Sequence, residues 1–325
     1  MGNIISEDRI FSLNSNDDFN RLALDVYAYQ KTHCRIYRDF IHLLDRPEPK
    51  DYTEIPFLPI SFFKEHDIIA EGYQPEVQFL SSGTTGMQRS KHLVARKVLY
   101  ERSFMTAYRQ LIGNPEEQVI LALLPSYIEQ GESSLVYMVD HLITESKSDK
   151  SGFLLNSIDE IEHRYAMACN AGKKTILFGV SYALLDLAEK GINLSEALII
   201  ETGGMKGRRK EMTKEELHDT LKKALKVETV LSEYGMTELL SQAYCDADMN
   251  FHTPPWMKVL IRDVNDPFGR AKEGKTGGIN VIDLANLYSC SFISTQDLGR
   301  SNGNQFQILG RFDQSDIRGC NLLVE

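Results

Sequence analysis

The alternation of short apolar runs with amphipathic stretches constrains the fold of this chain more than any other feature of its sequence. The apolar runs, which predict buried strands, lie at 119–124, 175–180, 197–200 and 227–231. The amphipathic stretches, which predict helices, lie at 97–112, 133–144, 181–190 and 213–226. Strands that alternate with helices indicate an α/β fold with a doubly wound, mostly parallel sheet. In such sheets a ligand binds in the loops that follow the carboxyl ends of the strands.

The two ends of the chain have a different pattern. Apolar residues spaced three and four apart over residues 16–44 predict a helical stripe that Asp45-Arg46-Pro47 ends, so residues 1–75 are expected to form a helical lead-in. Residues 76–250 are expected to form the α/β core, and residues 251–325 a β-rich part that ends in a short tail. The strands expected in this last part lie at 256–261, 278–282, 289–294 and 305–309.

Composition excludes several classes of protein. The 325 residues include 36 Lys and Arg against 46 Asp and Glu, and this net charge of −10 argues against a general nucleic-acid binder. No apolar run approaches the roughly 18 residues of a membrane helix, and no leader is visible, so a cytoplasmic protein without a membrane span is expected. The five cysteines form no CxxC pair, and the eight histidines show no HExxH spacing, so neither a disulfide framework nor a metal cluster is expected.

The first segment with recognisable chemistry is a polar loop rich in glycine and hydroxyl groups, Ser81-Ser82-Gly83-Thr84-Thr85-Gly86, followed by Arg89 and Lys91. Glycines let backbone N–H groups converge on a phosphate, hydroxyls donate hydrogen bonds, and cations neutralise the charge. The spacing is not that of a Walker A loop. A polar surface turn is the alternative.

Three further segments offer nucleotide-binding chemistry. Tyr234-Gly235-Met236-Thr237-Glu238 follows an apolar run and offers a flat ring, a hydroxyl and an oxygen ligand for Mg²⁺. Asp297 offers a carboxylate for two sugar hydroxyls, and Arg311 a guanidinium for the same nucleotide. The alternative for the first of these is a strand-end turn with an N-cap threonine before a helix.

The order and spacing of these four segments resemble the adenylate-forming superfamily of acyl-CoA synthetases, luciferases and peptide-synthetase adenylation domains. The closest resemblance is to the LuxE-type acyl-protein synthetases and the phenylacetate-CoA ligases. The same resemblance extends to Pro125-Ser126-Tyr127, 133–138, Gly203-Gly204-Met205-Lys206, Pro254-Pro255-Trp256-Met257 and 317–321. It covers most of the chain from residue 79 onward and implies the large-domain fold of these enzymes, with residues 1–325 as a single adenylation domain.

The resemblance also implies roles for individual residues. The Ser81–Gly86 loop would hold the β- and γ-phosphates of ATP, Tyr234 in the Tyr234-Gly235 turn would stack on adenine, and Thr237 would contact the α-phosphate. Glu238 would bind Mg²⁺, and Asp297 would bind the ribose hydroxyls beside Arg311. Gly203 and Gly204 would let the backbone approach the acyl group and the adenine.

The sequence departs from the superfamily in two places. The usual Pro-Lys-Gly after the phosphate loop is replaced by residues 87–91, so Arg89 and Lys91 are both candidates for the phosphate-binding cation. The sequence also ends soon after Gly310–Asp313, so the small C-terminal lid domain, with its lysine, is expected to be absent as in LuxE-type proteins. Lys206 in a basic run is the candidate to replace that lysine; a solvated helix start is the alternative.

Near the end of the sequence, Cys320 lies two residues after Arg318. LuxE-like enzymes pass the acyl group from the adenylate to a cysteine near their C-terminus and then to a partner reductase. A thiolate is a competent acyl acceptor, and Arg318 would favour it. The alternative is a buried cysteine in a closing strand.

The resemblance therefore implies an ATP-dependent acid–thiol ligase that uses Mg²⁺, converts a carboxylic acid, and a fatty acid above all, to acyl-AMP, and transfers the acyl group to a thiol. Catalytic roles fall to Cys320, Lys206 and Thr237. One alternative is a ligase that delivers the acyl group to coenzyme A or a carrier protein with a separate lid chain. The other is a catalytically silent nucleotide-binding subunit.

Overall fold

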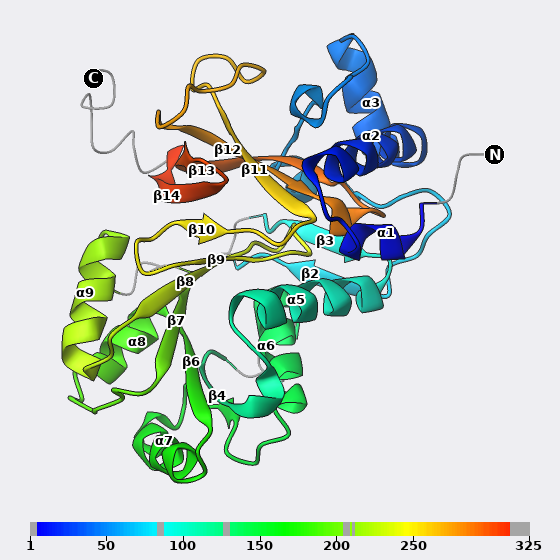
Figure 1. The fold of residues 1–325 in the computed structure, drawn as a ribbon. Coiled ribbons are helices and arrows are strands. Elements are labelled where there is room, and N and C mark those ends of the chain that lie inside the picture. Colours follow the sequence, from blue (N-terminus) through cyan, green and yellow to red (C-terminus); the bar gives the residue numbers. More distant parts are fainter. Residues whose placement is uncertain (1–4, 83–87, 126–130, 204–208, 210–211, 313–325) are drawn as a thin grey trace. The chain divides into compact units, whose positions relative to one another are not determined.

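A computed structural model of the chain describes residues 5–82, 88–125, 131–203, 209 and 212–312. These residues form two compact units (Figure 1). The first unit comprises residues 1–103, 237–241 and 250–325, and the second comprises residues 104–236 and 242–249. The domain limits expected from the sequence, at residues 75 and 250, remain a prediction.

A sheet of parallel strands organises the second unit. The strands are β4 (Gln118–Leu123), β5 (Gly152–Phe153), β6 (Lys174–Val180), β7 (Leu198–Thr202), β8 (Val230–Tyr234) and β9 (Ala243–Cys245). They lie in the order β5-β4-β6-β7-β8-β9, parallel except for the antiparallel pair β8 and β9. Every residue of β4 is buried, as expected for a strand covered on both faces. The predicted doubly wound, mostly parallel sheet is therefore confirmed.

Helices cover this sheet, with α8 and α9 on one side and α6 on the other (Figure 1). The helical elements are α6 (Ser134–Glu145), α7 (Ile161–Asn170), α8 (Ser181–Ala188), α9 (Lys214–Leu225), η2 (Pro115–Glu117) and η3 (Ile158–Glu160). Thr213 and Glu216 form a capping box that starts α9, and Lys226 ends this helix in the left-handed conformation. Because this turn takes up the residues that follow, β8 begins at Val230 and not at Val227 as the sequence predicts.

The first unit contains an antiparallel sheet. Its strands are β1 (Leu58–Pro59), β10 (Phe251–His252), β11 (Met257–Arg262), β12 (Gly277–Asp283), β13 (Phe292–Asn302) and β14 (Gln305–Arg311), with η4 (Leu284–Asn286) between β12 and β13. The order is β11-β12-β13-β14-β10, and β1 pairs with β13 in parallel. A separate hairpin joins β2 (Val77–Leu80) and β3 (Lys91–Val94). The β-rich prediction is confirmed, although β13 starts at Phe292 and continues to Asn302 rather than ending at Ser294.

Helices begin the first unit. They are α1 (Glu7–Phe11), α2 (Asn16–His33), α3 (Arg35–Leu44), η1 (Tyr52–Glu54) and α4 (Phe62–Glu65), and α5 (Lys97–Leu111) crosses the boundary between the units. The helical stripe predicted over 16–44 is carried by two helices, because Cys34 adopts an extended conformation (φ −98°, ψ 100°) that separates α2 from α3. Gln30 then lies in the core, where its side-chain amide donates to the carbonyl oxygens of Asn286 and Leu287.

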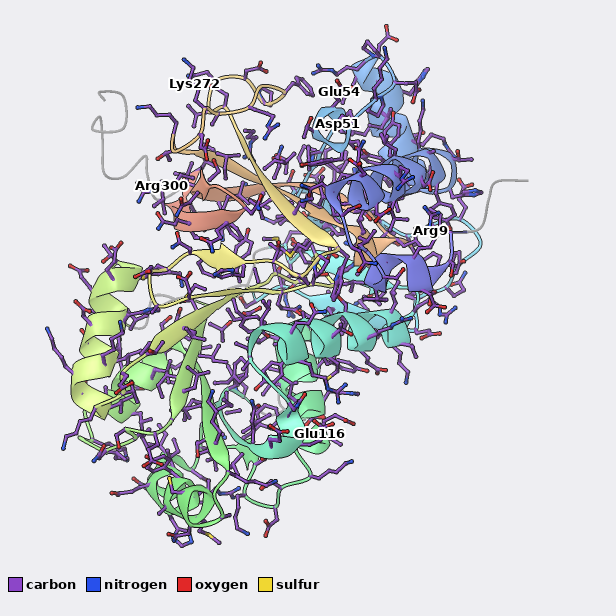
Figure 2. The ribbon with its side chains drawn as sticks, viewed as in Figure 1. Arg9, Asp51, Glu54, Glu116, Lys272 and Arg300 are labelled. Carbon is purple, nitrogen blue, oxygen red and sulfur yellow. The ribbon has the colours of Figure 1, made fainter. Side chains whose placement is uncertain are left out.

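Charged side chains such as Asp51, Glu54, Lys272 and Arg300 lie at the periphery of the first unit (Figure 2). Its interior is apolar and aromatic, with Trp256, Tyr37 and Phe292 all fully buried. None of the described helices combines the length and the apolar composition that crossing a bilayer requires.

Candidate functional site

Three buried side chains of the first unit fix the backbone of Thr237–Ser241. The Nδ1 atom of His92, on β3, lies 2.8 Å from the carbonyl oxygen of Thr237. Asn286 donates from Nδ2 to the carbonyl oxygen of Glu238 at 2.8 Å, and Asp283 accepts the amides of Leu240 and Ser241 at 2.8 and 2.9 Å. Because all three anchors are buried, this segment is held rigidly.

The histidine among these anchors is neutral at ordinary pH. Its Nε2 atom lies 3.0 Å from Oδ1 of Asn286, so both ring nitrogens of His92 face acceptors, and only an imidazolium donates to both. Burial lowers the pKa of His92 to about 4, so the ring donates to one acceptor at a time.

Glu238 is the buried carboxylate of this site. Its residue is only 4% exposed. Burial raises the pKa of Glu238, the negative charge of Asp297 raises it further, and hydrogen bonding to Ser90 and the positive charge of Lys64 lower it. Mg²⁺ in nucleotide sites is bound by one or two carboxylates together with substrate phosphates, so this donor set fits the ion. No group of three or more His, Cys, Asp or Glu side chains suited to a metal occurs among the described residues.

The two strands β13 and β14 bring Asp297 and Arg311 together. The residues face each other in the antiparallel register, with Arg311 Nε 3.9 Å from Asp297 Oδ1. Arg311 also donates to the side-chain oxygen of Gln296 at 3.0 Å. The Asp297 side chain is 19% exposed and the Arg311 side chain 53% exposed.

The β2–β3 hairpin carries both ends of the predicted phosphate loop. Ser81 and Ser90 are joined by two hydrogen bonds of 2.8 and 2.9 Å. Arg89 folds back and donates to the carbonyl oxygens of Leu80 and Ser81, and Lys91 forms an ion pair with Asp67. Ser82 is the last described residue after β2. Gly83, Thr84, Thr85 and Gly86 lie outside the described residues.

In the second unit the glycine motif that begins at Gly203 follows β7, and the Tyr234-Gly235 turn stands at the end of β8. Gly203 follows β7 with φ +73°, a conformation that side-chain-bearing residues rarely adopt. Tyr234 ends β8 and is 8% exposed. At Gly235 an added Cβ would lie 2.3 Å from Oε1 of Glu233, so a larger residue would require this carboxyl group to shift. Thr202 donates to Oε2 of Glu233 at 2.6 Å and so ties the two strand ends together.

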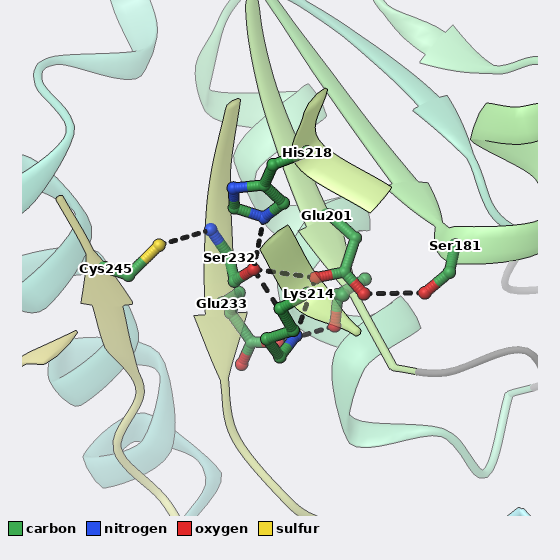
Figure 3. Close-up of polar contacts among 8 residues, drawn as sticks. Ser181, Glu201, Lys214, His218, Ser232, Glu233 and Cys245 are labelled. Atoms are coloured by element: carbon green, nitrogen blue, oxygen red, sulfur yellow. Dashed lines mark hydrogen bonds and ion pairs between the residues drawn. The ribbon is translucent and has the colours of Figure 1, made fainter. Parts of the chain in front are cut away.

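A network of buried polar side chains lies beside these strand ends (Figure 3). Glu201 accepts hydrogen bonds from Ser181 (2.6 Å), Ser232 (2.7 Å) and Lys214 (2.8 Å). His218 Nε2 lies 2.9 Å from the Ser232 hydroxyl. The network joins β7, β8 and the first turns of α8 and α9, and so holds the carboxyl ends of the strands.

His218 of this network and the neighbouring Glu233 have shifted pKa values. Burial raises the pKa of Glu233 to about 7, and the charge of Glu201 raises it too, although Thr202 and Lys214 oppose the shift. Burial also lowers the pKa of His218 to about 4, so this imidazole is neutral at pH 7. The second unit therefore contains a carboxyl group that changes charge near neutral pH.

The structure thus brings Glu238, Asp297 and Arg311 into the first unit together with Thr237, and places Gly203, Tyr234 and Gly235 in the second. Gly204, Lys206 and Cys320 lie outside the described residues. Sequence reasoning missed His92, Asn286, Asp283 and Lys64, because no local motif marks a residue that acts through a tertiary contact. It also missed Glu201 and Glu233, whose only signal is an acidic residue at the end of an apolar run.

A family model for the LuxE acyl-protein synthetases matches residues 4–325, nearly the whole chain. The chain belongs to the LuxE acyl-protein synthetase family. The resemblance seen in the motifs is thereby confirmed. No curated protein matches the sequence.

Solved structures share the fold of this LuxE-family chain. A 2-hydroxyisobutyryl-CoA ligase, solved in complex with 2-HIB-AMP and CoA, is 12% identical, with a TM-score of 0.64 over 92% of this chain and 70% of that one. ATP-bound MatB from Rhodopseudomonas palustris is 19% identical, with a TM-score of 0.55 over 72% of this chain and 47% of MatB. McyG A-PCP, complexed with phenylalanyl-adenylate, is 14% identical, with a TM-score of 0.52 over 76% and 48%. The LuxE-family chain therefore spans about half the length of MatB and McyG, and its fold is that of the adenylate-forming ligases.

Proposed function

We propose that this chain activates a carboxylic acid, a fatty acid above all, with ATP and passes the acyl group to a thiol. Membership of the LuxE family and the shared fold support the proposal. The observation that carries it is that Asp297 lies beside Arg311 and its charge acts on the buried Glu238, all within the first unit. Two carboxylates and an arginine there suit a sugar, a magnesium ion and phosphates.

The first step of the proposed reaction forms the acyl-adenylate. A carboxylate oxygen attacks the α-phosphorus of ATP, the bond to the β-phosphate oxygen breaks, and pyrophosphate leaves. Bound Mg²⁺ would neutralise charge on the phosphates. Glu238 would hold that ion, Thr237 would contact the α-phosphate, and Asp297 would bind the ribose hydroxyls beside Arg311. His92 and Asn286 would act by keeping Thr237 and Glu238 in place.

We propose that the phosphate loop binds the β- and γ-phosphates of ATP. Its residues are Ser81, Ser82, Gly83, Thr84, Thr85 and Gly86. Tyr234 would stack on the adenine, while Gly203, Gly204 and Gly235 would let the backbone approach the ligand. Lys206 is proposed to grip the carboxylate in the first step.

The second step transfers the acyl group. The thiolate of Cys320 attacks the acyl carbonyl, the bond to the AMP phosphate oxygen breaks, and AMP leaves with a thioester on the chain. An acyl-accepting reductase is then the proposed partner. Coenzyme A or a carrier protein is the alternative acceptor, because the 2-hydroxyisobutyryl-CoA ligase of the same fold is solved with CoA.

Exchange of ³²P-labelled pyrophosphate into ATP tests the first step, with Mg²⁺ and carboxylic acids from acetate to long-chain and aromatic ones. We expect exchange that depends on one class of acid, strongest with long-chain fatty acids. Absence of exchange with every acid contradicts the proposal and favours a nucleotide-binding subunit without catalysis.

A second assay tests the acceptor. The full chain and its Cys320→Ser variant are incubated with ATP and labelled acid, and protein-bound label is released with neutral hydroxylamine, which cleaves thioesters. We expect label on the wild-type chain only, with equal exchange rates for both. Equal labelling contradicts the role of Cys320, and thioester on added coenzyme A with the serine variant supports the alternative acceptor.

A further inference from the structure

Gln242 is a buried glutamine that directly precedes β9 in the second unit. The residue is 4% exposed. Its side-chain oxygen, Oε1, is enclosed by protein and has no hydrogen-bond partner among the described residues. A buried polar atom without a partner costs free energy, and native folds keep few such atoms. An acceptor left unpaired beside the end of a strand therefore points to a ligand that supplies the donor.

Gln242 lies next to Glu233, which is on the neighbouring strand β8. In the antiparallel ladder of β8 and β9, Tyr234 faces Ala243, so Gly235 and Gln242 are the next residues across from each other. A Cβ added at Gly235 would lie 2.3 Å from Oε1 of Glu233 and 3.2 Å from Cγ of Gln242. The two polar side chains therefore reach the same point beside this glycine.

Glu233 offers a second acceptor at this point. Thr202, at the end of β7, donates to its Oε2 atom at 2.6 Å, and no other hydrogen bond reaches this carboxyl group from the described part of the chain. The other oxygen, Oε1, is the one that lies beside Gly235. Burial raises the pKa of Glu233 to about 7, as expected for a carboxyl group with so few donors. Glu233 and Gln242 thus present two oxygens that can each accept a further hydrogen bond.

The strand ends that carry this pair are those at which a parallel sheet binds its ligands. β7 ends at Thr202 and β8 ends at Tyr234, and the crevice beyond the carboxyl ends of such strands receives the ligand. Gly203, the next residue after β7, is exposed. Among the described residues, a Cβ added there would have only Val180 within 4 Å, at 3.9 Å. The backbone beyond β7 is therefore uncovered at this point.

We propose that Gln242 and Glu233 form a subsite for one hydrogen-bond donor, an N–H or O–H group of a ligand bound to the second unit. A ligand that lacks the donor would leave both buried oxygens unpaired, so the pair selects against it. The inference rests on the proposed function, which supplies two sources of the donor: the amino group of adenine, and a hydroxyl group on the carboxylic acid.

The test uses the full chain with Mg²⁺ and ligands that differ in one donor. Isothermal titration calorimetry compares ATP with purine riboside triphosphate, which lacks the amino group. Pyrophosphate exchange compares the KM of dodecanoate with those of 2-hydroxydodecanoate and 12-hydroxydodecanoate. We expect the wild type to favour the ligand with the donor about 10- to 100-fold in one of the two comparisons, as for a hydrogen bond to a buried acceptor. Gln242→Met should reduce this preference to less than about threefold. Gln110→Met, at an exposed glutamine of the same unit, is the matched control and should leave it unchanged.

The comparison that shows the preference identifies the donor as the amino group of adenine or the hydroxyl group of the acid. No preference in either comparison, or a preference that survives Gln242→Met, overturns the inference. The proposed function still stands in that case, provided that acid-dependent exchange is intact.

Urea unfolding gives a second readout. Gln242→Met removes an unpaired buried acceptor, so it should not lower the free energy of unfolding. If this variant unfolds more easily than the wild type, the amide of Gln242 is bonded within the fold, and the inference is wrong. If the wild type neither binds ATP nor catalyses exchange, the proposed function is wrong and the inference falls with it.

Discussion

In the second unit the buried carboxylate of Glu201 meets three donors at 2.6–2.8 Å, from Ser181, Ser232 and Lys214. In the first unit, burial and then the charge of Asp297 raise the pKa of Glu238, although hydrogen bonds from Ser90 and from the backbone and the charge of Lys64 oppose the shift. A carboxylate with a full set of donors stabilises the fold and has little left to offer a ligand. A carboxylate buried with few donors costs stability, and a bound cation removes that cost. This difference favours a scaffolding role for the Glu201 network and agrees with the ligand-binding role proposed for Glu238.

The largest effect on stability is expected from Glu201→Ala, which leaves the hydroxyls of Ser181 and Ser232 buried without their acceptor. We expect the free energy of unfolding to fall by about 3 kcal/mol, as for the loss of one partner from a buried network. Urea unfolding of the full chain measures it. Glu189→Ala is the control, because Glu189 pairs with Arg209 at the surface, and it should cost less than about 0.5 kcal/mol. If Glu201→Ala lowers the free energy of unfolding as little as Glu189→Ala does, the network does not hold the strand ends.

Glu238→Gln, in contrast to Glu201→Ala, should lower activity without lowering stability. Pyrophosphate exchange is expected to fall about 10²- to 10³-fold, as for loss of a major electrostatic group at a reacting centre. The free energy of unfolding should stay the same or rise, because the substitution removes a buried charge. Exchange and urea unfolding are measured together, with Glu65→Gln on the exposed side of α4 as control. A variant that unfolds more easily while exchange persists would reverse the comparison.

The ionisation of Glu233, in the second unit, should make the stability of the fold depend on pH. Its pKa is raised from 4.5 to about 7 in the fold, so between those values the folded chain keeps a proton that the unfolded chain releases. Stability therefore falls as pH rises from about 4.5 to 7, and the full shift corresponds to roughly 3 kcal/mol at most.

Replacement of Glu233 by Gln removes this loss. We expect the variant to gain stability relative to the wild type as pH increases from 5 to 8, with little difference at pH 5. Urea unfolding at each pH measures the gain. A difference between the two proteins that is the same at every pH argues that Glu233 ionises normally.

The smallest effect is expected from Lys91→Ala. Lys91 pairs with Asp67 at the surface, so its loss should cost less than about 0.5 kcal/mol and change exchange less than twofold. Steady-state exchange at varied ATP tests this, with Asp67→Asn as the matched variant. A tenfold rise in the KM for ATP would instead assign Lys91 to the nucleotide, as the sequence motif predicts.

The sequence predicts the second unit best. Runs such as 119–124 are apolar on both faces, and a parallel sheet covered by helices requires that pattern, so the pattern alone identifies β4, β6 and β7. The break between α2 and α3 is different, because nothing local at Cys34 announces it. Buried Gln30, whose amide meets Asn286 and Leu287, shows that tertiary contacts fix the path of α2 in this region.

The sequence likewise reveals some residues of the candidate site and not others. Thr237, Glu238, Asp297 and Arg311 stand in short motifs, so their residue types reveal them. His92, on β3, meets the carbonyl oxygen of Thr237 only through a tertiary contact. Such contacts join residues far apart in the sequence, and no spacing rule predicts them.

The close approach of Glu233 to Gly235 has a consequence for how sequences of this kind diversify. A side chain at 235 would require the carboxyl group of Glu233 to shift away from its partner Thr202, so substitutions at the two positions should be coupled. Replacement of Gly235 by alanine should be tolerated only in a background where residue 233 is shortened, for example to serine. Among natural relatives, a residue other than glycine at 235 should therefore be accompanied by a small residue at 233.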